Sequence, residues 1–141
     1  MFFLKDLPTR EMISGYAQTL DVVDVQKTND ALHLLRKASL LIRRLERYFA
    51  LHGLSQTQFL VLMILHRDKS KDSHLAAEIR EKMDISKPVL STTLKTMRQR
   101  GLIHYSGKST DSRAKPLQIS EDGRKLLLKL LPEYFEILQS G

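Results

Sequence analysis

Hydrophobic residues recur at spacings of three and four along most of this chain, a period that predicts a mainly helical protein. A first helix is expected over residues 9–23, with Thr9 as its N-cap. The longest helical pattern covers residues 30–52 and stops before Gly53, a residue type that commonly ends helices. The polar residues between these two segments predict a connection over 21–30.

Three shorter helical segments follow. Ser55 and Gln58 have the spacing of a capping box and open a segment so apolar that its helix should be buried. Ser73 is the expected cap of a short helix over 74–83. The inward residues of that helix should be Leu75, Ala76 and Ile79. Ser86 starts the next helix, and two short helices joined by a tight turn form a helix-turn-helix.

The period changes after Gly101. Residues 102–105 and 116–119 read as paired strands, separated by a polar loop. A helix should follow, which Pro132 interrupts before a last short helix over 133–139. The pattern therefore predicts a mainly α fold with a small β-hairpin wing, a winged helix-turn-helix.

The charge of the chain is concentrated in one segment. Its 141 residues include 23 Lys or Arg and 16 Asp or Glu, a net charge of +7. Residues 85–115 hold seven of the basic residues and a single acidic one. A local positive surface suits a polyanion, because neutralised phosphates release counterions. The absence of cysteine excludes disulfides, cysteine-ligated zinc and thiol nucleophiles.

Two sets of residues are candidate DNA contacts. On a helical wheel, the side of the second helix away from Leu90 is small, polar and basic, with no acid. Hydroxyls there could bond phosphates or base edges, and lysines could bind phosphate or guanine. In the wing, Arg113 suits a narrow minor groove and Asp111 could hold its guanidinium in place. The recognition-helix candidates are Ser86, Lys87, Pro88, Ser91, Thr92, Lys95 and Arg98, and the wing candidates are Lys108, Asp111, Arg113 and Lys115.

Several motifs together resemble one family. They are Leu75-Ala76, Ser86-Lys87-Pro88-Val89-Leu90-Ser91, Arg100-Gly101-Leu102-Ile103, Asp111-Ser112-Arg113 and Leu117-Gln118-Ile119-Ser120-Glu121-Asp122-Gly123. Over about residues 28–131 the chain is similar to the MarR family of bacterial winged-helix transcription regulators. The resemblance implies a homodimer that binds a palindromic operator in double-stranded DNA, with recognition helices in major grooves and wings in minor grooves. It also implies a repressor that a small aromatic or anionic effector releases.

The resemblance further implies that flanking helices dimerise the protein. Because the segment after Ser120 is short and contains Pro132, we expect the helix over 9–23 to add dimer surface. The dimerisation candidates are Met12, Ile13, Tyr16, Leu20, Leu127, Leu131 and Phe135. The expected organisation comprises an N-terminal arm over 1–27 and a MarR-like domain over 28–141, with the winged helix-turn-helix at about 54–120 and closing helices over 121–139.

Other functions have weaker signals. No phosphate-binding glycine loop, nucleophile elbow or metalloprotease motif occurs, so we expect no enzyme activity and no cofactor. His66 and His74 flank one loop, which leaves a regulatory metal site as an alternative to the expected absence of metal. The longest apolar run, 59–65, is too short to span a membrane, and we expect a cytoplasmic protein. The main alternative function is a winged-helix module that docks an acidic protein partner without specific DNA binding.

Overall fold

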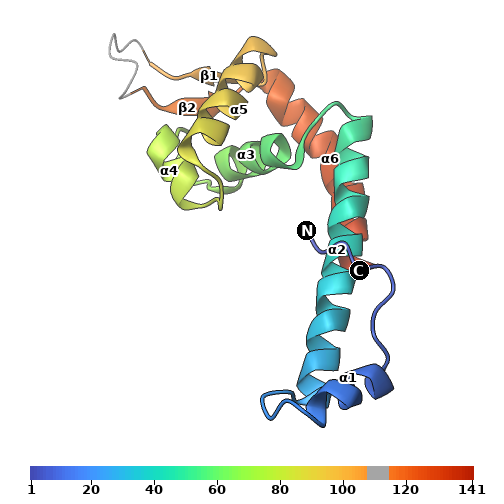
Figure 1. Cartoon of the computed structure of the whole chain (residues 1–141). Helices are drawn as coiled ribbons and strands as arrows, with labels where there is room; N and C mark the ends of the chain where they lie inside the picture. Colours follow the sequence, from blue (N-terminus) through green and yellow to red (C-terminus); the bar gives the residue numbers. More distant parts are fainter. Residues whose placement is uncertain (108–114) are drawn as a thin grey trace. The chain divides into compact units, whose positions relative to one another are not determined.

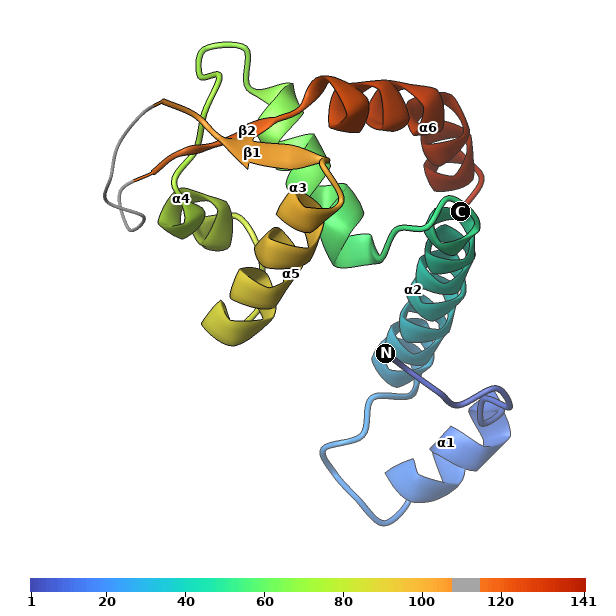
Figure 2. The ribbon, with the colours of Figure 1, turned by 90° about the horizontal axis from the view of Figure 1, so that it is seen from above.

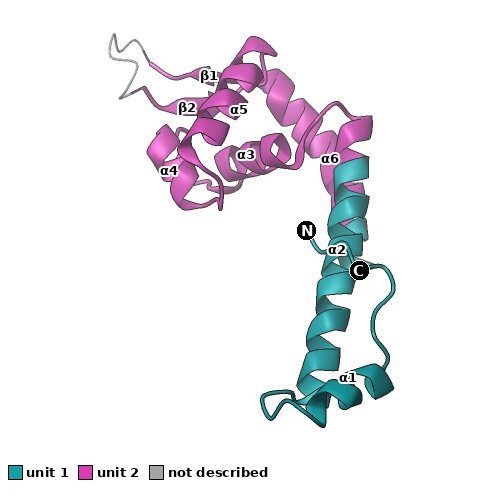
Figure 3. Ribbon diagram, in the orientation of Figure 1, with its two compact units in different colours: residues 1–47, 136–141 teal, residues 48–135 magenta. Residues whose placement is uncertain are grey.

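The computed structural model describes residues 1–107 and 115–141, which form six helices and one two-stranded sheet. This confirms the mainly α fold with a small hairpin. Contacts divide the described chain into two compact units (Figure 3). Unit 1 comprises residues 1–47 and 136–141, and unit 2 comprises residues 48–135. The division falls within α2 (Val25–Leu51), whereas the sequence suggested a boundary after residue 27.

Unit 2 is built around α3 (Gln56–Arg67), whose apolar residues are almost all buried. The capping box forms as predicted, because the Gln58 backbone N–H donates to Ser55 Oγ at 3.1 Å and the Ser55 N–H donates to Gln58 Oε1 at 3.0 Å. Figures 1 and 2 show α4 (Ala76–Glu81) and α5 (Lys87–Gln99) beside α3. Phe59 of α3 is fully buried and stacks on Phe49 with ring centroids 4.3 Å apart.

The predicted hairpin is present. Strands β1 (Ile103–Tyr105) and β2 (Leu117–Ile119) are antiparallel, with Ile103 opposite Ile119. A second backbone pairing ties β2 to the segment before α4, because His74 and Leu117 exchange N–H···O bonds of 2.9 and 2.7 Å. This pairing joins the wing to the helix-turn-helix.

The helix that follows the hairpin is longer than predicted. Helix α6 (Glu121–Gln139) continues through Pro132, so the predicted break at that residue is wrong. A proline inside a helix removes one N–H donor, but other interactions can offset that cost. The turns before Pro132 are held by buried Leu127 and Leu130, and the Leu130 carbonyl accepts a 2.8 Å hydrogen bond from the Tyr48 hydroxyl.

The start of α4 also differs from the prediction. Ser73 does not cap it, because the helix begins at Ala76 and Leu75 occupies the N-cap position. The side chain of Glu78 instead accepts a 3.0 Å hydrogen bond from the Leu75 N–H. Leu75 and Ala76 are exposed, and Ile79 is the buried residue of this helix.

In unit 1, helix α1 (Arg10–Ala17) is shorter than predicted. Thr9 caps it as expected, with its hydroxyl oxygen accepting from the Met12 N–H at 3.2 Å. The helix does not reach residue 23, because the Thr19 hydroxyl and the Leu20 N–H both donate to the Tyr16 carbonyl and close a turn. Conversely, α2 begins at Val25 within the predicted connection. The carboxylate of Asp24 caps it by accepting from the Lys27 N–H at 2.9 Å.

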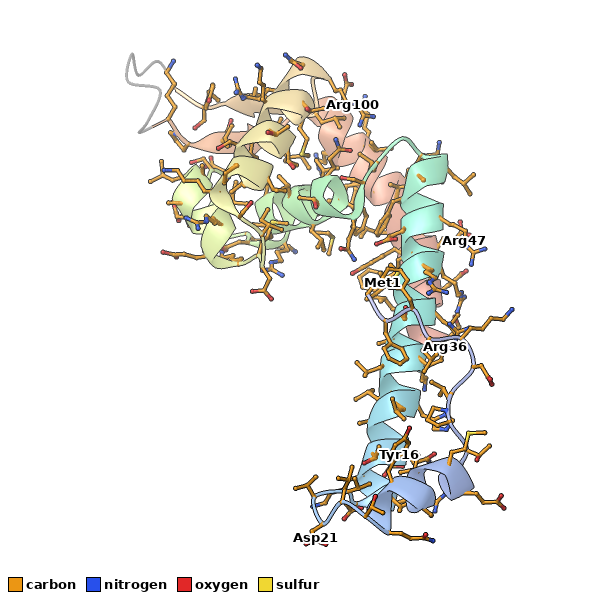
Figure 4. All side chains as sticks on the ribbon, viewed as in Figure 1. Met1, Tyr16, Asp21, Arg36, Arg47 and Arg100 are labelled. Atoms are coloured by element: carbon orange, nitrogen blue, oxygen red, sulfur yellow. The ribbon has the colours of Figure 1, made fainter. Side chains whose placement is uncertain are left out.

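Few residues of unit 1 are buried. Its N-terminal segment lies along α2, where the Ser39 hydroxyl donates to the Phe2 carbonyl at 2.7 Å. Many large apolar side chains stay exposed, namely Met1, Phe3, Leu4, Met12, Tyr16, Leu20, Val22, Leu34, Leu35, Leu40 and Leu138. Figure 4 shows Tyr16 on α1.

Two of the predicted dimer residues need correction. Ile13 is 4% exposed and Leu127 is 0% exposed in the single chain, so both belong to its core and cannot form a contact surface. Leu131 is half-buried, while Met12, Tyr16, Leu20 and Phe135 are exposed. Among the described helices, no single one is long and apolar enough to cross a membrane, and only the bent pair of α2 and α3 together reaches that length and composition.

Candidate nucleic-acid interface

Helices α4 and α5 form the predicted helix-turn-helix. The hydroxyl of Ser86 caps α5 by accepting from the Val89 N–H at 3.3 Å, and Gly101 follows the helix with a φ of 74°. The inward side of α5 is buried as predicted, through Leu90, Leu94 and Met97. Burial of that side fixes which residues α5 presents outward.

The outward side of α5 carries most of the predicted recognition residues. Those that are exposed are Ser86, Lys87, Pro88, Ser91, Thr92 and Lys95. The ion pairs within the described residues are Lys71–Glu78 and Glu121–Arg124. The lysines of α5 therefore have no carboxylate partner within that part of the chain and present free positive charge.

Arg98 is placed differently from the other recognition candidates. It is half-buried, and its guanidinium lies 4.6 Å from the ring centroid of Tyr105 on β1. Its Nε atom is buried with no hydrogen-bond partner among the described residues. The cation–π contact suits a residue that holds α5 against the hairpin.

Of the four wing candidates, only Lys115 lies within the described residues. Lys108, Asp111 and Arg113 lie outside the described residues. Lys115 is described, and its Nζ lies 5.6 Å from the ring centroid of Tyr105. Arg98 and Lys115 thus share one aromatic ring at the base of the hairpin, an arrangement that the sequence pattern did not indicate.

Arg100 has a structural contact that sequence reasoning missed. Its guanidinium donates to the Gly53 carbonyl at 2.7 Å and to Gln58 Oε1 at 3.3 Å. It thereby links the end of α5 to the capping box of α3. No local pattern could reveal this contact, because the partners lie 47 and 42 residues away.

An open groove lies beside the outward side of α5, with a volume of about 410 Å³. Its lining residues are Gln58, Pro88, Val89, Thr92, Thr93 and Thr96. Val89 is 49% exposed, unlike the other large apolar residues of α5. In the sequence, Val89 lies outside the row of inward residues Leu90, Leu94 and Met97. That position could have indicated an exposed apolar residue, but it was not used in the sequence prediction.

A second cavity, of about 380 Å³, lies between α3, the turn that joins α4 to α5, and Tyr134 of α6. Its apolar wall includes Leu60, Met63, Ile64, Met83, Ile85 and Tyr134, and its polar wall includes Gln56, Thr57, Arg67, Lys82 and Asp84. The cavity therefore combines an aromatic and aliphatic wall with two cations and one carboxylate.

His74 is buried at the pairing between the wing and the helix-turn-helix. It is 0% exposed, and neither ring nitrogen has a hydrogen-bond partner among the described residues. Burial lowers the pKa of this imidazole below its ordinary value of 6.5, and the nearby Lys82 and Lys71 lower it further while Glu78 and Asp68 oppose them. Among the described residues, no group of three or more acidic or histidine side chains gathers as a metal site requires.

Comparison with known proteins gives this geometry a context. Residues 52–114 match the model of the MarR family. The HTH-type transcriptional repressor YetL of Bacillus subtilis is 26% identical over 133 residues, which cover 94% of this chain and 78% of that protein.

Two solved structures share the fold. MosR of M. tuberculosis, solved in complex with DNA, aligns with a TM-score of 0.61 and 22% identity, over 77% of this chain and 80% of that one. BpsR of Bordetella bronchiseptica, studied for the regulation of its DNA binding by 6-hydroxynicotinic acid, aligns with a TM-score of 0.65 and 24% identity, over 79% of this chain and 83% of that one. The family match falls on the helix-turn-helix, and the curated relative is a repressor rather than an enzyme. Over residues 52–114, which include the helix-turn-helix, the chain is similar to the MarR family of transcription regulators.

Proposed function

We propose that this chain is a dimeric, sequence-specific DNA-binding protein that represses transcription and is released from its operator by a small ligand. The observation that carries the proposal is the outward side of α5, where Lys87 and Lys95 are exposed beside Ser91 and Thr92. No residue of α5 is acidic. Such a surface can enter a major groove, with lysines on phosphates and hydroxyls on base edges. Because the target is chromosomal DNA, the proposal implies a cytoplasmic location.

The wing extends this interface in the proposal. Arg113 would enter the flanking minor groove, where the focused negative potential attracts a guanidinium, and Asp111 would orient it. Lys108 and Lys115 would contact phosphates on either side. Arg98 would act indirectly, by keeping α5 and the hairpin in register through Tyr105.

The test is a selection of bound fragments from genomic DNA, followed by affinity measurements at several salt concentrations. A palindromic site with half-sites about one helical turn apart is expected for a dimer. Replacing Lys87 or Lys95 by Gln should reduce the slope of log K against log salt by about 1 if the lysine contacts phosphate. Lys129→Gln, which removes an exposed charge from α6, is the matched control and should leave the slope unchanged.

The alternative is a module that docks an acidic protein. It predicts equal affinity for the selected site and for random DNA of the same length, and this result would contradict the proposal.

Dimerisation through unit 1 is the second part of the proposal. Its support is the set of exposed apolar side chains on that unit, among them Met12, Tyr16, Leu20, Leu34 and Leu35. Exposed large apolar side chains in such number commonly mark protein–protein contacts. A second copy of the chain is the partner that a palindromic operator requires. Phe135 and Leu131, which belong to unit 2, remain separate candidates for dimer contacts.

Release by a ligand is the third part. The 380 Å³ cavity is of ordinary size for a small-molecule site, and it borders the turn that positions α5. Its apolar wall and its two cations, Arg67 and Lys82, suit a small aromatic carboxylate. The regulation of BpsR by 6-hydroxynicotinic acid supports that ligand class.

The ligand test uses 6-hydroxynicotinic acid as its probe. Millimolar additions should displace the wild-type protein from its selected site, and Arg67→Met should weaken that displacement while binding DNA normally. Arg80→Met, at an exposed cation outside the cavity wall, is the matched control. Equal responses of the two variants would argue against this cavity.

A further inference from the structure

Val89 is an exposed apolar residue on an otherwise polar side of α5. Its exposed fraction is 49%, whereas Leu90, Leu94 and Met97 of the same helix are 3%, 6% and 0% exposed. A β-branched residue also has a lower helix propensity than alanine. Neither burial nor helix formation therefore accounts for valine at this position.

The hydroxyl groups near Val89 are partly committed to the helix itself. Ser86 Oγ accepts the capping bond from the Val89 N–H, and Thr93 Oγ1 donates to the Val89 carbonyl at 2.8 Å. Ser86 and Thr93 are therefore poorly placed to read bases through those hydroxyls. The side chain of Val89, by contrast, is exposed in the first turn. It lines the open groove together with Pro88 and Thr92.

The first turn of a recognition helix is the part that contacts base edges in the major groove. In that groove each base pair presents hydrogen-bond donors and acceptors, and thymine alone presents a methyl group. The valine side chain has no hydrogen-bond donor or acceptor, so it cannot bond the polar base edges in the groove. Its methyl groups can pack on the thymine methyl group, which removes the apolar surface of both side chain and base from water.

We propose that Val89 is a specificity-determining residue that reads the C5 methyl group of thymine at one position of each operator half-site. The inference rests on the proposed function and adds the base that this residue selects. Lys87 is exposed in the same first turn, so it can hold a phosphate while Val89 faces the base.

The experiment replaces each thymine of the selected site by deoxyuridine in turn, which removes one methyl group and leaves the hydrogen-bonding pattern intact. For the wild-type chain we expect a loss of about fourfold per half-site at one symmetric position, the equivalent of one buried carbon. Val89→Ala should bind thymine and deoxyuridine at that position equally well. Its fold should be intact, because alanine favours the helix and Val89 is 49% exposed.

Lys95→Gln is the matched control from the same side of α5. It should weaken binding to every DNA but keep the thymine preference, because a lysine does not contact a methyl group. The inference is overturned if no thymine position responds to methyl removal in the wild-type chain, or if Val89→Ala keeps the preference. A failure to select any specific site would overturn the proposed function and this inference together, whereas a specific site without a methyl response overturns this inference alone.

Discussion

Units 1 and 2 differ in how completely each buries its own apolar residues. Unit 2 encloses a core in which Phe59, Ile79, Met97, Ile103 and Leu130 are at most 2% exposed. Unit 1 buries few residues, among them Ile13 and Leu45, and leaves Phe3, Met12 and Tyr16 largely exposed. A unit that closes its own core can position side chains for recognition, while a unit that leaves apolar surface open is suited to a partner.

The same contrast appears in the hydrogen bonds. In unit 2, contacts between distant segments are specific, such as Arg100 with Gly53 and His74 with Leu117. In unit 1, the N-terminal segment is held to α2 through the Phe2 carbonyl, which accepts from Ser39 and Arg43. These contacts set the architecture of unit 2 within one chain, whereas few such contacts hold the N-terminal segment of unit 1.

The largest expected effect is on the core of unit 2. Phe59→Ala removes a fully buried ring that stacks on Phe49, and should lower the free energy of unfolding by about 3–5 kcal/mol. Phe3→Ala, at a residue that is 77% exposed, should change it by less than about 0.5 kcal/mol. Chemical denaturation at low protein concentration measures both. Equal losses would mean that unit 1 is as tightly packed as unit 2.

The next effect concerns the open surface of unit 1. Tyr16→Ala should weaken dimerisation by about 30-fold, or about 2 kcal/mol, if the ring is a central contact. Sedimentation equilibrium of the full chain measures this constant. Leu75→Ala, at an exposed apolar residue of unit 2, is the control and should sediment like the wild type. A Tyr16→Ala protein that dimerises normally would remove α1 from the proposed interface.

His74 makes the stability of unit 2 dependent on pH. Because its pKa is lowered in the folded chain, the unfolded chain binds a proton more readily. The stability is fully present above pH 6.5 and is lost as pH falls from that value toward the folded pKa. His74→Leu should flatten the melting temperature between pH 5 and 7. His104→Gln, at an exposed histidine, should keep the wild-type slope, and the same slope in His74→Leu would refute the assignment.

Most signals that depend on neighbouring residues were predicted correctly from the sequence, although the cap at Ser73 was not. The caps at Thr9, Ser55 and Ser86 and the turn at Gly101 each need only a few consecutive residues. The hairpin was predicted for the same reason, since strand alternation and the polar loop are local.

Features that depend on tertiary contacts were missed. The Arg100 contacts, the Arg98–Tyr105 stack and the burial of His74 join residues that no periodic pattern connects. Pro132 misled for the opposite reason, because its local preference to break a helix is outweighed by contacts elsewhere along α6. The candidate DNA surface was predicted as a helix side, but which of its side chains are free to contact DNA required the structure.

The smallest expected effects compare one kind of helix cap in the two units. Ser86→Ala removes the cap of α5 and should lower the global free energy of unfolding by about 1 kcal/mol. Thr9→Ala removes the equivalent cap of α1, whose eight residues bury only Ile13. The loss of stability from Thr9→Ala should be confined to α1. Hydrogen exchange of the α1 amides should become roughly fivefold faster, while the midpoint of global unfolding stays unchanged. If Thr9→Ala instead lowers the global stability as much as Ser86→Ala, the two units unfold together and the contrast between them does not extend to folding.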